Sequence, residues 1–171
     1  MKGILIITLF SVLNLFAAEV PDLKLKQVNG ETLDLAKLKG KAVVYVNVAT
    51  RCGYTGQLDD LEKLYQKYKS RGLVVVGMPS NDFGGQTPES NKEVGKFCRL
   101  KYGVTFPLLE KSSVKGPQKS KLAKVLTESG DEISWNFEKF VVDKKGKIVT
   151  RFKSGTEPLS SELTKAVERL L

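Results

Sequence analysis

The sequence predicts an α/β domain built on a mixed β-sheet, and three patterns carry that prediction. Two nearly continuous apolar runs, at residues 42–48 and 73–78, are typical of strands buried on both faces. Apolar residues between them recur at helical spacing, so the three segments predict a βαβ unit with parallel strands. Two pairs of segments joined by short turn signals predict hairpins, one before this unit and one after it. The 171 residues fit one domain.

The first elements are predicted from a turn signal and from helical periodicity. Asn29-Gly30 favours a two-residue hairpin turn between strands at residues 23–27 and 31–35. The helix between the two buried strands is predicted over residues 55–70, with Gly72 placed to end it. Its apolar positions are Leu58, Leu61, Leu64, Tyr65 and Tyr68.

A second helix is predicted after a loop rich in glycine and proline at residues 79–89. Ser90 and Glu93 fit a capping box, and Gly103 can end this helix. Gly95 lies in its interior, where glycine costs about 1 kcal/mol relative to alanine. We therefore expect Gly95→Ala to stabilise this helix.

The rest of the chain is predicted to return to the sheet and to end in a helix. The predicted elements are, in chain order, an extended edge segment at residues 104–109, a helix at 122–126, a hairpin of strands 135–142 and 147–152, and a last helix opened by Pro158.

Composition limits the chemistry that this domain can perform. The chain has no histidine and two cysteines, Cys52 and Cys98. Without histidine there is no Ser–His–Asp triad, no Cys–His dyad and no His-ligated zinc. Two cysteines are too few for a four-thiolate zinc site or a cysteine-ligated iron–sulfur cluster. We expect no metal and no cofactor, so catalysis would use a thiol, carboxylates, amides, lysines or hydroxyls.

The basic balance of the chain is weak evidence about partners. Lys and Arg number 28 against 19 Asp and Glu, which gives a net charge of +9. The lysines are spread along the chain and form no basic stripe with interleaved aromatic residues, so no nucleic-acid partner is predicted. A solvated surface explains the charge, and attraction to an acidic protein or anionic lipid is the alternative.

Residues 1–18 have the pattern of a secretory signal peptide. Lys2 precedes an uncharged apolar stretch that ends in Ala17-Ala18. The stretch is shorter than the ~20 residues that a spanning helix needs. Cleavage would leave a domain of residues 19–171 in an exported space such as the bacterial periplasm, where thiols tend to pair. The alternatives are a first core helix and an uncleaved anchor.

Cys52 is the candidate nucleophile. It follows a buried strand and precedes a helix, where the helix dipole and free N–H groups are expected to lower the pKa of the thiol. Arg51 would add positive charge if its side chain points toward the sulfur. The polar setting argues against the alternative of an inert buried cysteine. Because Thr55 fills the fourth position, no Cys-x-x-Cys exchanger is formed, and a thiol that attacks a peroxide remains open.

Three segments, in chain order, resemble the motifs of the glutathione peroxidase family. They are residues 47–55 (NVATRCGYT), 78–88 (MPSNDFGGQTP) and 135–140 (WNFEKF). Asp82 and Thr87 depart from the residues usual in the second motif, and the similarity extends from about residue 20 to the C-terminus. The resemblance implies a thioredoxin-like fold, reduction of hydroperoxides and a part in the response to oxidative stress.

The same resemblance implies a set of catalytic residues. It identifies Cys52 as the peroxidatic thiol and Gln86, Trp135 and Asn136 as its partners. Amide and indole N–H groups are neutral donors that favour a thiolate over a thiol and can hold a peroxide oxygen. Each partner also has a structural alternative, because a tryptophan can be a core anchor, Gln86 a loop residue and Asn136 a turn residue.

Cys98 determines which reductant is expected. Phe97-Cys98 resembles the resolving-cysteine position of the non-animal branch of the family, whose members take electrons from thioredoxin-like proteins. This implies a sulfenic acid at Cys52, a Cys52–Cys98 disulfide and its reduction by an external dithiol. The alternatives for Cys98 are an ordinary core cysteine and a permanent structural disulfide.

Two further expectations concern the whole protein. A glutathione-dependent peroxidase and a peroxide-sensing relay are the alternatives to the thioredoxin-dependent enzyme. No long insertion of the kind linked to tetramers in the family is present, which implies a monomer. Because a disulfide needs Cα atoms about 4.4–6.8 Å apart, we expect the helix that carries Cys98 to open before the bond forms.

Overall fold

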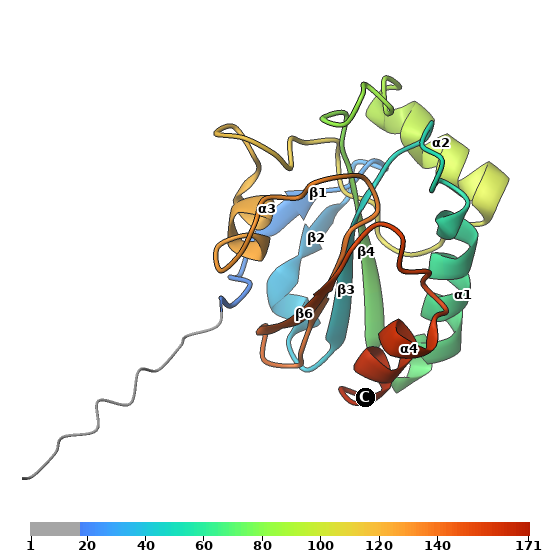
Figure 1. Ribbon diagram of the computed structural model, residues 1–171. Coiled ribbons are helices and arrows are strands. Elements are labelled where there is room, and N and C mark those ends of the chain that lie inside the picture. Colours follow the sequence, from blue (N-terminus) through green and yellow to red (C-terminus); the bar gives the residue numbers. More distant parts are fainter. Residues whose placement is uncertain (1–17) are drawn as a thin grey trace, which may run out of the picture.

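A computed structural model describes residues 18–171 as a mixed sheet covered on both faces (Figure 1). The four central strands have the order β4-β3-β5-β6, with β3 parallel to β4 and antiparallel to β5. This confirms the predicted α/β architecture. The predicted signal peptide lies outside the described residues except for Ala18. The elements are β1 (Lys24–Lys26), β2 (Thr32–Asp34), β3 (Ala42–Val48), α1 (Gln57–Tyr68), β4 (Leu73–Pro79), α2 (Asn91–Tyr102), α3 (Lys121–Leu126), β5 (Lys139–Val142), β6 (Ile148–Phe152) and α4 (Ser161–Glu168).

The two apolar runs are buried because each face of the sheet has its own cover. Val44 and Val46 of β3 pack in one core cluster with residues of α1, α2 and α4. Val43 and Tyr45 point to the other face and pack with residues of α3 and the β1–β2 hairpin. Figure 1 shows the same division, with α1, α2 and α4 on one side of the sheet. No helix among the described residues is long and apolar enough to span a membrane.

The β1–β2 hairpin forms as predicted, but its loop has a different length. The N–H of Gln27 donates to the carbonyl of Glu31 at 2.9 Å, which leaves a three-residue loop rather than the two-residue turn predicted. Gly30 has φ +86°, as the left-handed position of such a loop requires. Val28 belongs to the loop because its N–H bonds to the carbonyl of Leu108 at 3.0 Å. A contact distant in sequence therefore sets the loop length.

The helix boundaries confirm most of the capping predictions. Ser90 Oγ accepts the N–H of Glu93, and Glu93 Oε2 accepts the N–H of Ser90 at 2.9 Å, so α2 begins with the predicted capping box. Gly103 ends α2 in a left-handed conformation, and Gly72, also left-handed, ends the short 3-10 helix Lys69–Arg71 that follows α1. The last helix begins later than predicted, because Ser160 rather than Pro158 precedes its first turn and caps it.

Gly95 has a packing role that its helix propensity does not reveal. A Cβ at this position would lie 2.9 Å from Val28 Cγ2 and 3.4 Å from Val28 Cβ. Valine has little rotational freedom, and overpacking typically costs about 1–3 kcal/mol. That cost offsets the gain of about 1 kcal/mol in helix propensity. The expected stabilisation by Gly95→Ala therefore does not hold, and glycine is needed where α2 approaches the hairpin loop.

The predicted strand at residues 135–142 is shorter than expected. β5 begins only at Lys139, and the residues before it form a turn in which Phe137 has φ +65°. Residues 104–109 lie beside β4 at the sheet edge, where Leu108 bridges Gly77 in parallel. This position confirms the extended edge segment predicted for residues 104–109.

Candidate active site

Cys52 lies in the turn between β3 and α1. Thr55 Oγ1 accepts the N–H of Cys52 at 2.9 Å and donates to the carbonyl of Ala49 at 3.0 Å, which fixes the turn. The N–H of Tyr54 donates to Cys52 Sγ at 3.5 Å. The residue is 9% exposed and belongs to the buried core, so the expectation that its polar setting keeps Cys52 from burial is wrong. Thr55, which removes the Cys-x-x-Cys motif, therefore shapes the backbone around the remaining cysteine.

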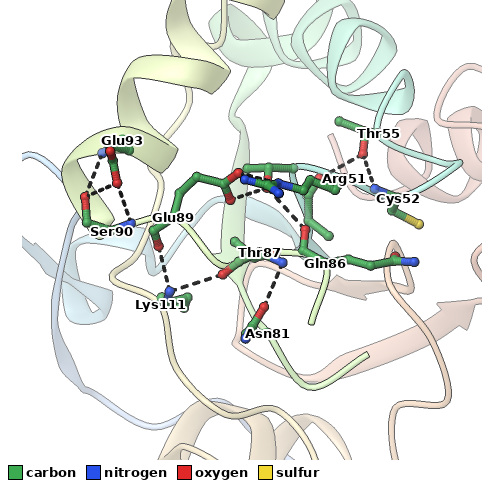
Figure 2. Close-up of polar contacts among 12 residues, drawn as sticks. Arg51, Cys52, Thr55, Asn81, Gln86, Thr87, Glu89, Ser90, Glu93 and Lys111 are labelled. Carbon is green, nitrogen blue, oxygen red and sulfur yellow. Dashed lines mark hydrogen bonds and ion pairs between the residues drawn. The ribbon is translucent and has the colours of Figure 1, made fainter. Parts of the chain in front are cut away.

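Arg51 does not direct its charge at the sulfur. Its Nε donates to Glu89 Oε1 at 2.8 Å, and Figure 2 shows the guanidinium pointing away from Cys52 Sγ. Any stabilisation of a thiolate at Cys52 must therefore come from N–H groups such as that of Tyr54. This resolves the question that the sequence left open about Arg51.

Gln86 is held beside the Cys52 turn by its own backbone. Its carbonyl accepts the N–H groups of Thr50 at 3.2 Å and Arg51 at 3.0 Å. The hydroxyl of Thr50 donates to the same carbonyl at 3.2 Å. In Figure 2 the amide of Gln86 extends toward the side of the loop on which the Cys52 sulfur lies. The loop after β4 therefore holds the backbone of Gln86 beside the turn that carries Cys52.

Asn136 and Gln86 form an amide pair. Asn136 Nδ2 donates to Gln86 Oε1 at 3.0 Å across 50 residues of sequence. Because Gln86 Oε1 is occupied, its Nε2 group remains as the donor that can face the thiol or a substrate oxygen. Asn136 is fully buried, and its Oδ1 has no partner among the described residues. An unpartnered buried acceptor is costly, and a catalytic role is one of the explanations for such an atom.

Trp135 reaches the site from the same turn as Asn136. Its ring packs against Phe83 of the Gln86 loop, with 5.7 Å between the ring centroids and an interplanar angle of 54°. The side chain is 40% exposed, so the alternative of a buried core anchor does not apply. No hydrogen bond among residues 18–171 joins Cys52 Sγ to Gln86, Trp135 or Asn136. Among Cys52, Gln86, Trp135 and Asn136, the one hydrogen bond within the described residues is that between Gln86 and Asn136.

The sequence analysis did not identify Asn47, which holds the turn at residues 135–138 in place. Its Nδ2 donates to the carbonyl of Trp135 at 3.0 Å, and its Oδ1 accepts the N–H of Glu138 at 3.0 Å. Its carbonyl also accepts the N–H of Phe137 at 2.7 Å. These bonds hold Phe137 in its left-handed conformation and fix the turn that carries Trp135 and Asn136. The sequence did carry a signal for Asn47, because it is a polar residue inside the apolar run of β3.

Cys98 lies well inside α2 and faces the core. It is 1% exposed, and both cysteines are free thiols in the structure. Burial raises the pKa of the Cys98 thiol to about 12, so it is protonated and unreactive in this conformation. Cys52 and Cys98 belong to the same core cluster, on one face of the sheet. Within the described residues, no group of three potential metal ligands is present.

A buried lysine supports the start of α1 behind the Cys52 turn. Lys139 Nζ is fully buried and donates to Gln57 Oε1 at 2.5 Å and to the carbonyls of Ser154 and Thr156 at 3.2 and 2.6 Å. Gln57 is the first residue of α1, and its N–H donates to the carbonyl of Tyr54. Burial lowers the pKa of Lys139 from 10.5 to about 8. The sequence analysis did not identify this residue as part of the site.

Because of Lys139, we expect the free energy of unfolding to change with pH in the alkaline range. Above pH 8 the folded protein loses this proton, whereas the unfolded chain keeps it up to pH 10.5, so the free energy of unfolding should rise between these values. The difference between these two pKa values corresponds to a change of roughly 3 kcal/mol in the free energy of unfolding. Urea unfolding of the wild type and Lys139→Met across this range measures it. Parallel pH profiles of the two proteins would contradict the assignment.

Comparison with known proteins identifies the family. Residues 20–127 match the sequence profile of the glutathione peroxidase family. This chain belongs to the glutathione peroxidase family. Glutathione peroxidase-like peroxiredoxin 2 of Saccharomyces cerevisiae is 46% identical over 158 residues, which cover 88% of this chain and 95% of the yeast protein. A glutathione peroxidase of Lactococcus lactis is 39% identical over 155 residues, covering 88% of this chain and 98% of that protein.

Solved structures place this chain in the thioredoxin-like fold, as the resemblance implied. A thiol:disulfide interchange protein of the thioredoxin family from Chlorobium tepidum has a TM-score of 0.71 at 20% identity, covering 90% of this chain and 96% of its own. At that identity the likeness concerns the fold. Membership of the family makes the protein a peroxidase, an oxidoreductase that reduces peroxides.

Removal of either amide should slow peroxide attack by Cys52. We expect Gln86→Ala and Asn136→Ala each to lower the rate constant of Cys52 oxidation by about 10²-fold, as for the loss of one oxyanion-hole donor. Single-turnover stopped-flow measures that constant. Gln118→Ala is the matched control, because Gln118 is exposed and makes no side-chain hydrogen bond with the described residues. Wild-type rates in both variants would remove the amides from the catalytic set.

Proposed function

We propose that this protein is an exported two-cysteine thiol peroxidase that reduces hydrogen peroxide and organic hydroperoxides through Cys52. The Cys52 thiolate attacks one peroxide oxygen, the O–O bond breaks, and the other oxygen leaves as hydroxide or alkoxide and takes a proton. Cys52 becomes a sulfenic acid while the peroxide is reduced to water or alcohol. The observation that carries the proposal is the Gln86–Asn136 pair, bonded at 3.0 Å and held at the Cys52 turn.

The amide pair supports peroxide attack in a specific way. Asn136 fixes Gln86 Oε1, which leaves the Nε2 donor for the thiolate or for the departing oxygen. Trp135 adds an indole N–H on the exposed side of the site. These neutral donors stabilise negative charge on sulfur and oxygen without a histidine, which the chain lacks.

Cys98 is proposed as the resolving cysteine. It lies on the same face of the sheet as Cys52, in the same core cluster. Its raised pKa keeps the thiol inactive until α2 opens and exposes it to water. The exposed thiolate then forms the Cys52–Cys98 disulfide, and an external dithiol reduces that bond by exchange.

A thioredoxin-like protein is proposed as the reductant, with glutathione as the alternative. Relatives that are 46% identical in yeast and in Chlamydomonas reinhardtii are named peroxiredoxins, which supports a protein dithiol as donor. Steady-state peroxide consumption with thioredoxin and thioredoxin reductase, compared with glutathione and glutathione reductase, tests the choice. We expect turnover with thioredoxin. Turnover with glutathione alone would overturn this part of the proposal.

Export to a bacterial periplasm or an equivalent space is proposed from residues 1–18. A cleaved signal peptide is supported by Lys2, by the apolar stretch after it and by Ala17-Ala18. We also propose that the domain acts as a monomer. Intact mass of the protein purified from its native source is expected to lack residues 1–17 or 1–18. A full-length cytosolic product would contradict this localisation.

A further inference from the structure

Basic side chains that are spread along the sequence gather at one end of the folded domain. This end lies opposite the Cys52 turn, where β3 and β4 begin side by side and where β5 turns into β6. The sequence shows no basic stripe there, because the contributing segments are distant along the chain. We call it the basic end and define it by six exposed side chains, Lys41, Lys67, Lys69, Arg71, Lys145 and Lys147.

Backbone hydrogen bonds hold the contributing segments together. The N–H of Gly40 donates to the carbonyl of Lys144 at 2.9 Å, which joins the turn before β3 to the β5–β6 turn. The N–H of Ala42 donates to the carbonyl of Gly72 at 3.0 Å, which joins the start of β3 to the segment after α1. Figure 1 marks the same end by the letter C, since Lys144 Nζ donates to an oxygen of Leu171 at 3.0 Å. The fold therefore fixes these cations close to one another.

The cations of the basic end exceed the carboxylates around them. Among the described residues, none of the six makes an ion pair. Two neighbouring lysines add nothing to the balance, because Lys39 pairs with Asp22 at 2.7 Å and Lys144 is bonded to Leu171. Three further carboxylates lie at this end, so the six cations leave a surplus of three positive charges. These carboxylates belong to Glu19, Asp143 and Glu168.

The described chain also begins at the basic end. The N–H of Ile148 donates to the carbonyl of Ala18 at 3.2 Å, and the N–H of Val20 donates to the carbonyl of Gly146 at 2.8 Å. Residues 3–17, which precede Ala18, contain no charged side chain in the sequence. While such an apolar leader is attached to a membrane, the basic end is the part of the domain joined to it. This connection favours lipid over an acidic protein as the surface that the basic end meets.

We propose that the basic end binds the surface of an anionic lipid bilayer. Each Lys or Arg near such a surface strengthens binding by about fivefold. A surplus of three charges therefore gives binding about 10²-fold stronger to anionic than to neutral lipid. The six side chains come from separate turns and from the end of α1, so together they suit a plane of headgroups. The inference goes beyond the proposed function, because it does not depend on the chemistry of Cys52.

This orientation leaves the active site facing water. β3 runs from the basic end to the Cys52 turn and has seven residues. At about 3.3 Å per residue, the strand separates the two by about 23 Å. The Debye length at physiological ionic strength is only about 8 Å, so charges at the basic end have little effect on Cys52. The bound protein thus reduces peroxides that are dissolved beside the membrane.

Cosedimentation with vesicles tests the proposal on protein purified after expression of the full-length sequence. The vesicles contain phosphatidylcholine alone, which is neutral, or phosphatidylcholine mixed with anionic phosphatidylglycerol. A change from about 0.1 M to about 1 M salt shortens the Debye length from about 10 Å to about 3 Å. We expect binding to the mixed vesicles to be about 10²-fold stronger than to the neutral ones at the lower salt. At the higher salt this difference should disappear.

Two triple variants remove the surplus charge from different segments. The first, K67Q/K69Q/R71Q, changes the end of α1 and the residues after it, and the second, K41Q/K145Q/K147Q, changes the two turns. The matched control is K92Q/K96Q/K121Q, which removes three exposed cations of α2 and α3 that also lack ion pairs within the described residues. Circular dichroism checks that all three variants are folded.

We expect each variant of the basic end to bind mixed vesicles about 10²-fold more weakly than the wild type, and the control to bind like the wild type. All four proteins should reduce hydrogen peroxide at the same rate. Equal weakening in all three variants would overturn the proposal, because net charge alone would then explain the binding. Equal wild-type binding to both kinds of vesicle would also overturn it and assign the binding to the apolar leader. Absence of binding to either would overturn it and leave an acidic protein as the partner.

Discussion

Cys52→Ser is expected to abolish peroxide reduction. A serine hydroxyl stays protonated at neutral pH and cannot form a sulfenic acid, so both the nucleophile and its oxidised product are lost. Cys98 cannot replace it, because that thiol is 1% exposed and its pKa is raised to about 12. Stopped-flow measurement of peroxide loss, with enzyme in excess, should give the rate seen without enzyme.

The substitution should leave the fold intact, which makes the result interpretable. Cys52 Sγ accepts one N–H, from Tyr54, and a serine oxygen can accept the same bond. Circular dichroism and urea unfolding therefore serve as controls for structure. Peroxide consumption by a folded Cys52→Ser protein at more than the background rate would show that another group carries the chemistry.

Replacement of Cys98 is expected to separate the first oxidation from turnover. Cys98→Ala should consume one equivalent of peroxide at the wild-type rate and then stop when thioredoxin is the donor, because no disulfide can form. Alanine is preferred to serine here, because a hydroxyl at this fully buried position would cost about 1–3 kcal/mol. Thioredoxin-coupled NADPH oxidation measures turnover, and single-turnover stopped-flow measures the first step.

This pair of measurements distinguishes two of the three roles considered for Cys98, and a third measurement tests the other. Sustained turnover of Cys98→Ala with thioredoxin would contradict the resolving role and leave an ordinary core cysteine. A permanent structural disulfide is a separate possibility that the protein as isolated tests, since alkylation before any peroxide treatment would then label neither thiol. We expect alkylation of the isolated protein, denatured without added reductant, to label both thiols.

Local sequence signals predicted the elements that depend on local physics. The apolar run of β3 marks a strand covered on both faces, and the Ser90–Glu93 box marks the start of α2. Contacts between distant segments explain the exceptions. The hairpin loop has three residues because Val28 bonds to Leu108, and Gly95 is required because Val28 fills the space above it.

The resemblance named the principal residues of the candidate site. It did not name the residues whose hydrogen bonds position them. Asn47 and Lys139 stand out as polar side chains within buried strands, and each makes three bonds that shape the site. The pairing of Arg51 with Glu89 gave no signal, because the two residues are distant in sequence. Hydrogen bonds of this kind depend on tertiary structure, which periodicity and capping rules do not describe.

Peptide mapping after a single equivalent of peroxide tests the central claim most directly. The reduced protein is mixed with peroxide, quenched with acid and an alkylating reagent, digested, and the cysteine-containing peptides are weighed. We predict one peptide pair joined by a Cys52–Cys98 disulfide, which thioredoxin converts back to two free thiols. Oxidised Cys52 without any bond to Cys98, or a disulfide that thioredoxin does not reduce, would contradict the account.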